Sequence, residues 1–297
     1  MFRLPLPLVL MLAACGGPTY DVLIHGGTVY DGTGAPGVAA DVAIQGDSIV
    51  AVGDLARARA RLRIDATGLA VAPGFINMLS WATESLIFDG TSQADIRQGV
   101  TLEVMGEGVS MGPLSDTMKV QAGADQGDIT YPIEWTTLGE YLEYLERKGI
   151  APNVASFVGA TTVRVHEVGF ADRAPTPDEL ERMKALVAQA MEEGALGLGS
   201  SLIYAPAFYA GTEELVELAR VVGRYDGMYI SHMRSEANRL LEAADELIHI
   251  AAVAGIPAEI YHLKAGGQPN WSKMDLLLAK VDSARAAGLA ITACMYP

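Results

Sequence analysis

The sequence is poor in cysteine and has no excess of positive charge. Its 297 residues include two cysteines, and 21 Lys and Arg residues are outnumbered by 36 Asp and Glu residues, for a formal net charge of −15. A nucleic-acid-binding surface needs a basic patch or stripe, and none stands out, so the sequence argues against that class of partner. An acidic balance is more often related to solubility than to recognition.

Long apolar runs are also scarce. The run at the N-terminus, Leu4 to Leu12, follows the positive charge of Arg3 and leads into Leu12-Ala13-Ala14-Cys15. It is too short to span a bilayer, and Leu-Ala-Ala-Cys resembles the bacterial lipobox, in which the cysteine is lipidated. We therefore expect residues 1–15 to be a lipoprotein-type signal peptide, with the protein tethered to the cell envelope facing the periplasm. Gly16 favours the outer membrane, and the alternative is an ordinary signal peptide that happens to contain a cysteine.

The scarcity of cysteine also limits disulfides. If Cys15 carries lipid, Cys294 is the only thiol left, so no intramolecular disulfide can form, although the compartment would permit one. Cys294 could be a soft metal ligand, but a small buried residue is its more usual role.

Half of the residues are hydrophobic, which is enough to bury a substantial core. In residues 16–72, apolar and polar residues alternate between Gly and Asp turns, as in "DVLIHGGTVYDGTG" and "DVAIQGDSIVAVGD". This alternation predicts short β-strands and a small N-terminal β-domain.

From residue 73 the pattern changes to apolar strand candidates separated by helical stretches. The seven candidates are "GFINMLS", "TLEVMGEG", "NVASFVGA", "LGLGSSLIY", "MYISHMR", "AEIYHLKA" and "AITACMYP". The clearest helix is expected to begin after Thr176, with Pro177 in its first turn and Glu179 completing a capping box, and to end at Gly194. Strands that alternate with helices predict a parallel sheet with βαβ connections.

The α/β pattern of residues 73–297 indicates a (β/α)₈ barrel of the TIM type. Such a barrel needs an eighth strand and its helix, so we expect the barrel to be truncated before its eighth strand and the chain to be a fragment. The alternative is an open doubly wound sheet, but the first strand–helix junction has no glycine-rich dinucleotide-binding turn.

Three polar residues stand at the C-terminal ends of otherwise apolar strand candidates. Glu107 ends "TLEVMGEG", His232 ends "MYISHMR", and His262 lies in "AEIYHLKA". Reactive groups of a barrel gather at these ends, and one carboxylate with two imidazoles is a suitable ligand set for zinc that leaves a position for water. Taken singly, each histidine could be a hydrogen-bonded core residue and Glu107 an exposed turn residue. The combination favours a metal site.

Other polar residues are candidates for contact with a substrate. Lys264 follows His262 by two residues, so it could bind a substrate carboxylate from the same side of the strand, or be a charge at the rim. Arg234 and Glu236 follow His232 and could line the pocket or cap the next helix. Tyr204 is a weaker candidate.

These landmarks together resemble the N-acyl-D-amino-acid deacylase (D-aminoacylase) branch of the amidohydrolase superfamily. The matching segments are "DVLIHGGTVYDGTG", "VAPGFI", "QGVTLEVMGEGVSMGPL", "GALGLGSSLIYAP", "YISHMRSE" and "AEIYHLKAGG". The resemblance implies a (β/α)₈ barrel with a small β-sandwich, part of which would come from a C-terminal segment. It also implies zinc-dependent hydrolysis of an amide or related C–N bond.

The resemblance also implies roles for single residues. His232 and His262 fall on the family's two strand-end zinc ligands, and Glu107 falls in the loop that supplies a bridging ligand, a cysteine in typical D-aminoacylases. Lys264 matches a residue expected to hold the substrate carboxylate, and Tyr204 matches a tyrosine of the pocket.

The sequence departs from the family where a second metal would bind. The family's pair of histidines one residue apart is replaced by Leu79 and Trp81. We therefore expect one zinc ion. The catalytic aspartate, the usual general base, is expected in a C-terminal segment near the eighth strand, and Cys294 stands where an aspartate would be expected.

Two classes of function remain open. The first is a zinc-dependent hydrolase of C–N bonds other than peptide bonds, most readily one that removes the acyl group from N-acyl-D-amino acids; dipeptides and cyclic amides are related substrates. Its partner would be a small acylated amino acid, and the fragment itself would be inactive. The second is a catalytically degenerate barrel that acts as a ligand-binding lipoprotein. Retention of Glu107, His232 and His262 favours the enzyme.

Overall fold

The computed structural model describes residues 19–295, and the predicted signal peptide with Cys15 lies outside them. Contacts divide the chain into two compact units, with the boundary between Gly74 and Phe75. Within the described residues, no helix combines the length and the apolar character needed to cross a bilayer.

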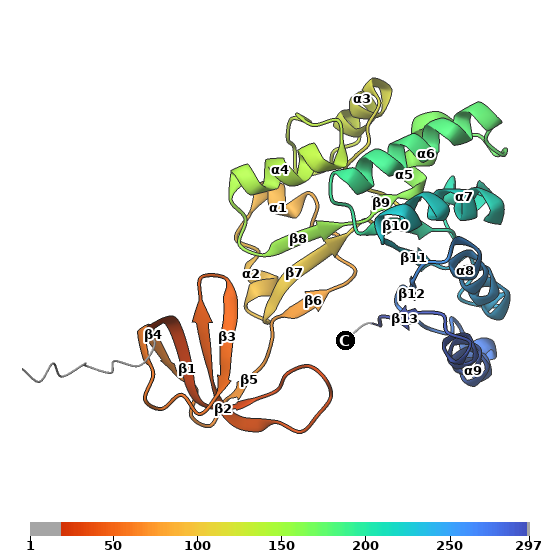
Figure 1. Cartoon of the computed structure of the whole chain (residues 1–297). Coiled ribbons are helices and arrows are strands. Elements are labelled where there is room, and N and C mark those ends of the chain that lie inside the picture. The colour runs from red at the N-terminus through yellow and green to blue at the C-terminus, as the bar shows by residue number, and fades with distance from the viewer. Residues whose placement is uncertain (1–18, 296–297) are drawn as a thin grey trace, which may run out of the picture. The chain divides into compact units, whose positions relative to one another are not determined.

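The first unit is a five-stranded sheet, and the strands that the alternation predicts are present (Figure 1). The strand order is β3-β2-β1-β4, with β5 paired to β1; β2 pairs antiparallel with β1 and β3, whereas β4 and β5 pair parallel with β1. A two-residue turn joins β2 to β3, and its Gly46 has φ +61°, a conformation that glycine adopts at little cost. The strands are β1 (Thr19–Val29), β2 (Val38–Gln45), β3 (Ser48–Gly53), β4 (Arg59–Asp65) and β5 (Ala70–Val71).

One face of this sheet carries rows of apolar side chains. Registered pairs place Val52, Val42, Ile24 and Ile64 in one row across four strands. Val52 is 57% exposed and Ile64 is 43% exposed, so the two ends of the row are open. A second row on the same face contains Ile49, Ile44, Val22 and Leu62.

The second unit is an α/β fold with parallel strands, as the alternation predicts. All seven strand candidates form strands, and the third is interrupted by Phe157, which separates β8 from β9. They make two parallel sheets, β6-β7-β8 and β9-β10-β11-β12-β13. The strands are β6 (Phe75–Asn77), β7 (Val100–Met105), β8 (Asn153–Ser156), β9 (Val158–Gly159), β10 (Gly197–Ser201), β11 (Met228–His232), β12 (Ala258–Ile260) and β13 (Ile291–Ala293).

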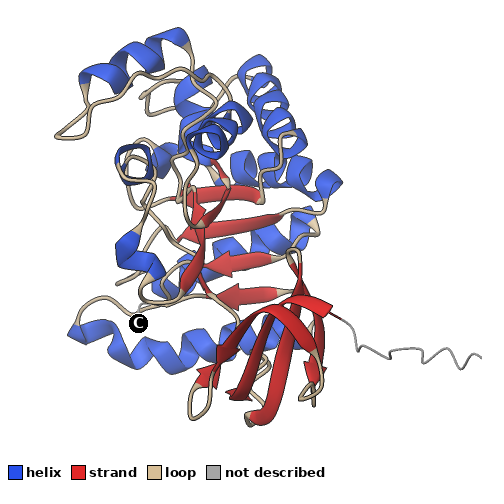
Figure 2. Cartoon of the chain, turned by 90° about the vertical axis from the view of Figure 1, so that its left-hand side faces the viewer, coloured by secondary structure: helices blue, strands red, loops and turns tan. Residues whose placement is uncertain are grey.

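The helices of this unit lie outside its strands (Figures 1 and 2), so the apolar core forms between the two layers. The α-helices are α1 (Ser85–Phe88), α2 (Gln93–Ile96), α3 (Asp116–Ala124), α4 (Leu138–Lys148), α5 (Ala160–Glu167), α6 (Pro177–Glu192), α7 (Thr212–Val222), α8 (Leu240–Ala254) and α9 (Met274–Ala286). Three short 3₁₀ helices are η1 (Ala207–Tyr209), η2 (Gly223–Tyr225) and η3 (Gln268–Lys273).

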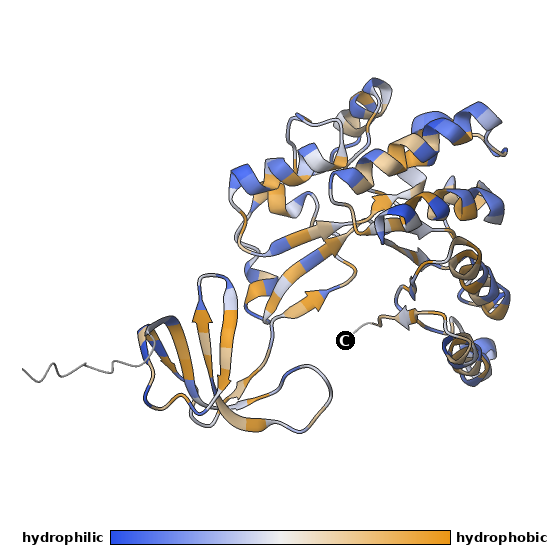
Figure 3. Cartoon of the chain, in the orientation of Figure 1, coloured by the Kyte–Doolittle hydropathy of each residue, from blue (hydrophilic) through white to orange (hydrophobic). Residues whose placement is uncertain are grey.

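Helix α6 has the capping box that its sequence predicts. The Glu179 backbone N–H donates to Thr176 Oγ1 at 3.3 Å, and the Thr176 N–H donates to the Glu179 carboxylate at 2.7 Å. These two bonds satisfy N–H groups that the first helical turn leaves without partners. Figure 3 shows apolar and polar positions alternating along the helix, and the apolar side, including Met183 and Val187, is buried. Gly194, with φ +99°, follows the end of the helix.

Candidate metal centre

Glu107 lies two residues beyond β7, in the loop Gly106-Glu107-Gly108. Both glycines have positive φ angles, +102° and +74°. A Cβ atom on Gly106 would lie 2.3 Å from the carbonyl oxygen of Phe157, and one on Gly108 would lie 2.5 Å from Cβ of Ser201. Only glycine fits at these two positions, so the Gly-Glu-Gly sequence allows the loop to pass close to neighbouring strands.

The two histidines come from the ends of adjacent strands. His232 is the last residue of β11, and His262 lies two residues beyond β12. His262 has φ +36°, which is uncommon for a residue with a side chain. Its backbone N–H donates to Sγ of Cys294 at 3.2 Å. Cys294 therefore supports the turn that presents His262, and burial raises the pKa of its thiol.

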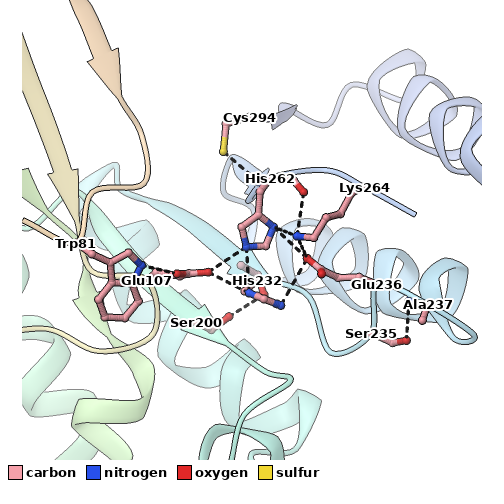
Figure 4. Close-up of polar contacts among 11 residues, drawn as sticks. Trp81, Glu107, Ser200, His232, Ser235, Glu236, Ala237, His262, Lys264 and Cys294 are labelled. Carbon is pink, nitrogen blue, oxygen red and sulfur yellow. Dashed lines mark hydrogen bonds and ion pairs between the residues drawn. The ribbon is translucent and has the colours of Figure 1, made fainter. Parts of the chain in front are cut away.

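Three ligand atoms converge in this region (Figure 4). Nδ1 of His232 lies 3.0 Å from Oε1 of Glu107, and Nε2 of His262 lies 3.1 Å from the same oxygen. The two ring nitrogens lie 3.0 Å apart. All three residues are buried. Among residues 19–295, this is the group of at least three His, Cys, Asp or Glu side chains whose geometry could hold a metal ion.

This donor set fits a cation better than it fits protons. If Nδ1 of His232 and Nε2 of His262 both carry protons, the two N–H groups face each other. If one of these nitrogens carries no proton, its lone pair lies beside the Glu107 carboxylate oxygen, which also has lone pairs. A metal ion would remove that conflict, and two imidazoles with one carboxylate suit zinc. Burial acts to raise the pKa of Glu107, but hydrogen bonds from His232, His262 and Trp81 outweigh it and lower the pKa to about 2. The carboxylate is therefore ionised and ready to bind.

A second carboxylate lies on the far sides of both imidazole rings. Oε1 of Glu236 is 3.0 Å from Nδ1 of His262 and 3.5 Å from Nε2 of His232. The latter nitrogen is buried and has no hydrogen bond to any described residue. Carboxylates placed in this way fix the tautomer and orientation of metal-binding histidines. Burial acts to raise the pKa of Glu236, and hydrogen bonds from His262 and Lys264 lower it overall.

The sequence predicts that Glu236 lies in a loop, where it lines the pocket or caps the next helix. Its position four residues after His232 does not by itself predict that it reaches both histidines. Only the fold, which brings the loop after β11 beside the loop after β12, shows this role.

The structure brings two of the three predicted substrate residues to the centre. Nζ of Lys264 lies 2.6 Å from Glu236 Oε1 and 2.9 Å from Nδ1 of His262. Lys264 stands in the loop after β12, not on the strand as expected, because β12 ends at Ile260. The ring of Tyr204 lies edge-on to that of His232, with centroids 5.3 Å apart, and is 60% exposed.

Arg234 is held elsewhere. Its guanidinium forms an ion pair with Glu246 at 2.9 Å and donates to the carbonyl oxygens of Phe208 and Ala210 at 2.8 Å each. It also stacks over the Phe208 ring. These contacts give Arg234 a structural role, since they join the loop after β11 to α8 and to η1.

Trp81 contacts Glu107, whereas Leu79 packs into an apolar cluster. Nε1–H of Trp81 donates to Oε2 of Glu107 at 2.9 Å, so the carboxylate uses its second oxygen here. Leu79 packs against a small apolar cluster formed by Val104, Phe157, Ile230 and Tyr261. Neither side chain offers a lone pair that binds metal, as the sequence predicts.

Comparisons with known proteins bear on the family. The chain is 35% identical to a D-aminoacylase from Alcaligenes xylosoxydans xylosoxydans over 268 residues, which are 90% of this chain and 55% of that protein. It is 34% identical to an N-acyl-D-glutamate deacylase of the same organism, over 93% of this chain and 57% of that one. No protein-family model matches the chain.

Solved structures of deacylases are also similar to this chain. A D-aminoacylase studied for the functional role of its binuclear metal centre matches with a TM-score of 0.85 at 35% identity, covering 94% of this chain and 58% of that one. The N-acyl-D-glutamate deacylase of Bordetella bronchiseptica, solved with zinc and a phosphonate inhibitor, matches with a TM-score of 0.83 at 30% identity, covering 94% and 59%. The chain belongs to the N-acyl-D-amino-acid deacylase branch of the amidohydrolase superfamily.

Membership of this branch confirms the resemblance drawn from the motifs. A D-hydantoinase, at 16% identity and a TM-score of 0.53, shows a shared fold alone. The chain spans 55% and 57% of the lengths of the two curated deacylases above. It holds the three clustered side chains Glu107, His232 and His262.

Proposed function

We propose that the protein containing this chain is a zinc-dependent hydrolase that removes the acyl group from N-acyl-D-amino acids. The observation that carries the proposal is the convergence of Glu107, His232 and His262, with their ligand atoms 3.0–3.1 Å apart. Relatives at 33–35% identity are named D-aminoacylase and N-acyl-D-glutamate and N-acyl-D-aspartate deacylases, which supports the substrate class.

Each residue of the centre has a task in this proposal. Glu107, His232 and His262 would hold one zinc ion, which when bound polarises the scissile carbonyl and makes water a stronger nucleophile. Glu236 holds the outer ring nitrogen of His262, which keeps the inner one directed at the metal position. Lys264 would exchange its contact with Glu236 for the carboxylate of the substrate.

The position of Lys264 would favour acylated amino acids over simple amides as substrates. Its ammonium lies 2.9 Å from a ring nitrogen of His262, so an anion bound there would place a neighbouring amide close to the metal ligands. Tyr204, exposed and beside His232, would contact the substrate from another side. We place the general base, an aspartate, in a further C-terminal segment of the full-length protein.

The same longer protein would complete both units. Exposed apolar residues on one face of the β1–β5 sheet, among them Val52 and Ile64, support a β-sandwich in which additional strands cover that face. The parallel strands β6–β13 would belong to a (β/α)₈ barrel closed by an eighth strand.

We further propose that the protein is an envelope lipoprotein held by lipid on Cys15, with Gly16 directing it to the outer membrane. The signal layout of residues 1–15 supports this. Full-length protein should fractionate with membranes, and Cys15→Ser should move it to the soluble fraction. A wild-type protein found only in the soluble fraction would reject the anchor while leaving the enzymatic proposal intact.

The activity is tested on the full-length protein. N-acetyl-D-amino acids with apolar and acidic side chains should be hydrolysed, and their L-enantiomers should be hydrolysed at least ten times more slowly. His262→Ala should abolish turnover, whereas His249→Ala, an exposed histidine on α8, should leave it unchanged. Equal turnover in the His262→Ala variant would show that the centre takes no part, and the ligand-binding alternative would then return.

A further inference from the structure

The carboxylate of Glu107 has two oxygens, and the structure gives them different partners. Oε1 faces the ring nitrogens of His232 and His262, while Oε2 accepts the indole N–H of Trp81 at 2.9 Å. An indole nitrogen is a donor only and has no lone pair for a metal. Oε2 of Glu107 is therefore hydrogen-bonded to a neutral donor, the indole N–H of Trp81.

The backbone just before Trp81 is fixed in a place that makes this contact possible, while the Trp81 side chain itself is 59% exposed. Strands β6 and β7 pair in parallel with Asn77 opposite Glu103, and Trp81 and Glu107 each lie four residues further along. The intervening Ser80 donates its backbone N–H to Val104 O at 2.8 Å, and its hydroxyl donates to Oε2 of Glu103 at 2.7 Å.

The backbone bond continues the β6–β7 pairing beyond the end of β6, and the side-chain bond strengthens it. Ser80 is buried and directly precedes Trp81, so the backbone that carries the indole is fixed, and the bond to Glu107 orients the ring.

The surroundings of Oε2 are unsuited to a second cation. Leu79, two residues before Trp81, contributes to an apolar cluster instead of offering a ligand. Within residues 19–295, the ligand group contains Glu107, His232 and His262 and no fourth His, Cys, Asp or Glu side chain. A cation on Oε2 would have to displace the indole N–H of Trp81.

We propose that Trp81 is a positioning residue that restricts this centre to one metal ion. Its N–H takes the place on Glu107 that a second cation would need for a bridging carboxylate, and it fixes the carboxylate so that Oε1 faces the histidines. This inference rests on the proposed zinc centre and adds to it the residue that sets the number of ions.

The test counts metal ions in full-length protein after saturation with zinc and removal of the excess. Wild type should hold one ion per chain. The double variant Leu79→His/Trp81→His, which supplies two imidazoles beside a released Oε2, should hold two. The absorption spectrum of bound Co²⁺ should show a second site, filled after the first, in the double variant only.

A single substitution covers the case in which the double variant does not fold. Trp81→Phe keeps an aromatic ring and removes the N–H, so the dissociation constant for zinc should rise about tenfold, as for other groups that hold a ligand in place. Trp271→Phe is the matched control, because Trp271 is exposed on η3, and its zinc affinity should equal that of wild type.

The outcomes separate this inference from the proposed function. Two ions in wild type, one ion in a folded double variant, or unchanged affinity in Trp81→Phe would overturn the role of Trp81 and leave a zinc hydrolase possible. A folded wild type without any metal would reject the proposed function, and the role of Trp81 would be rejected with it.

Discussion

Oε1 of Glu236 lies 3.0 Å from Nδ1 of His262, on the opposite side of the ring from Glu107. The imidazole therefore stands between two carboxylates, one on the metal side and one behind it. A ring held in this way keeps Nε2 directed at the metal position without any movement on binding. Preorganisation of this kind raises metal affinity because less freedom is lost when the ion arrives.

Glu236→Gln should weaken zinc binding about 10–100-fold, because the amide cannot match the carboxylate as a partner for the ring proton. Competition with a chelator, monitored by metal analysis, measures this effect. Glu242→Gln, an exposed residue on α8, is the control and should bind zinc like wild type. Equal affinities for the two variants would show that Glu236 does not support the histidines.

Lys264→Met should impair substrate binding more than metal binding. Loss of a charge-assisted hydrogen bond, worth about 1.5–3 kcal/mol, predicts that kcat/KM for an N-acyl amino acid falls ~10–100-fold, mainly through KM. An acylated amine without the carboxylate should be processed equally by wild type and variant. If both substrates lost activity to the same degree, Lys264 would act on the centre itself and not on the substrate.

Gly106→Ala should destabilise the protein, since the added Cβ would lie 2.3 Å from Phe157 O and φ is +102°. Strain at one such position costs about 1–3 kcal/mol, before the clash is counted. Gly123→Ala in α3 is the control: nothing lies within 4 Å, and the change should stabilise the helix by about 0.5–1 kcal/mol. Denaturant unfolding measures the stability of both variants. If Gly106→Ala were as stable as wild type, the Gly106-Glu107-Gly108 loop would be able to rearrange around the added Cβ.

The cap of α6 predicts a dependence of stability on pH. The hydrogen bonds from Arg173 and from the backbone of Thr176 lower the pKa of Glu179 from its ordinary 4.5 to about 2. Because the folded-state pKa is depressed, the contribution of the carboxylate is fully present above pH 4.5 and is lost as pH falls towards 2.

Glu179→Gln keeps the capping geometry and removes the charge. The difference in unfolding free energy between wild type and this variant should therefore shrink between about pH 4.5 and pH 2. A difference that stays constant over this range would mean that the charge of Glu179 contributes nothing.

Much of the fold follows from local sequence patterns. Alternation in β1–β4 and the capping box at Thr176 and Glu179 act over a few residues, so they are visible without the structure. The grouping of Glu107 with the two histidines could also be anticipated, because parallel strands direct their C-terminal ends to one edge.

The rest of the centre depends on contacts between loops. Glu236 meets His262, and Trp81 meets Glu107, only because the turns after β6, β7, β11 and β12 adopt particular paths. The sequence predicts that Cys294 is a small buried residue or a soft ligand, but it is only half-buried and its sulfur accepts a backbone N–H from His262. Such contacts leave no periodic pattern, so sequence alone could not predict them.

Zinc content of the full-length protein tests the central claim most directly. Elemental analysis should find about one zinc ion per chain in wild type and in the control variant His249→Ala. It should find none in the double variant His232→Ala/His262→Ala, as expected for one site with two imidazole ligands. One ion retained by the folded double variant would place the metal elsewhere, and a folded wild type with no zinc would contradict the account of this site as a metal centre.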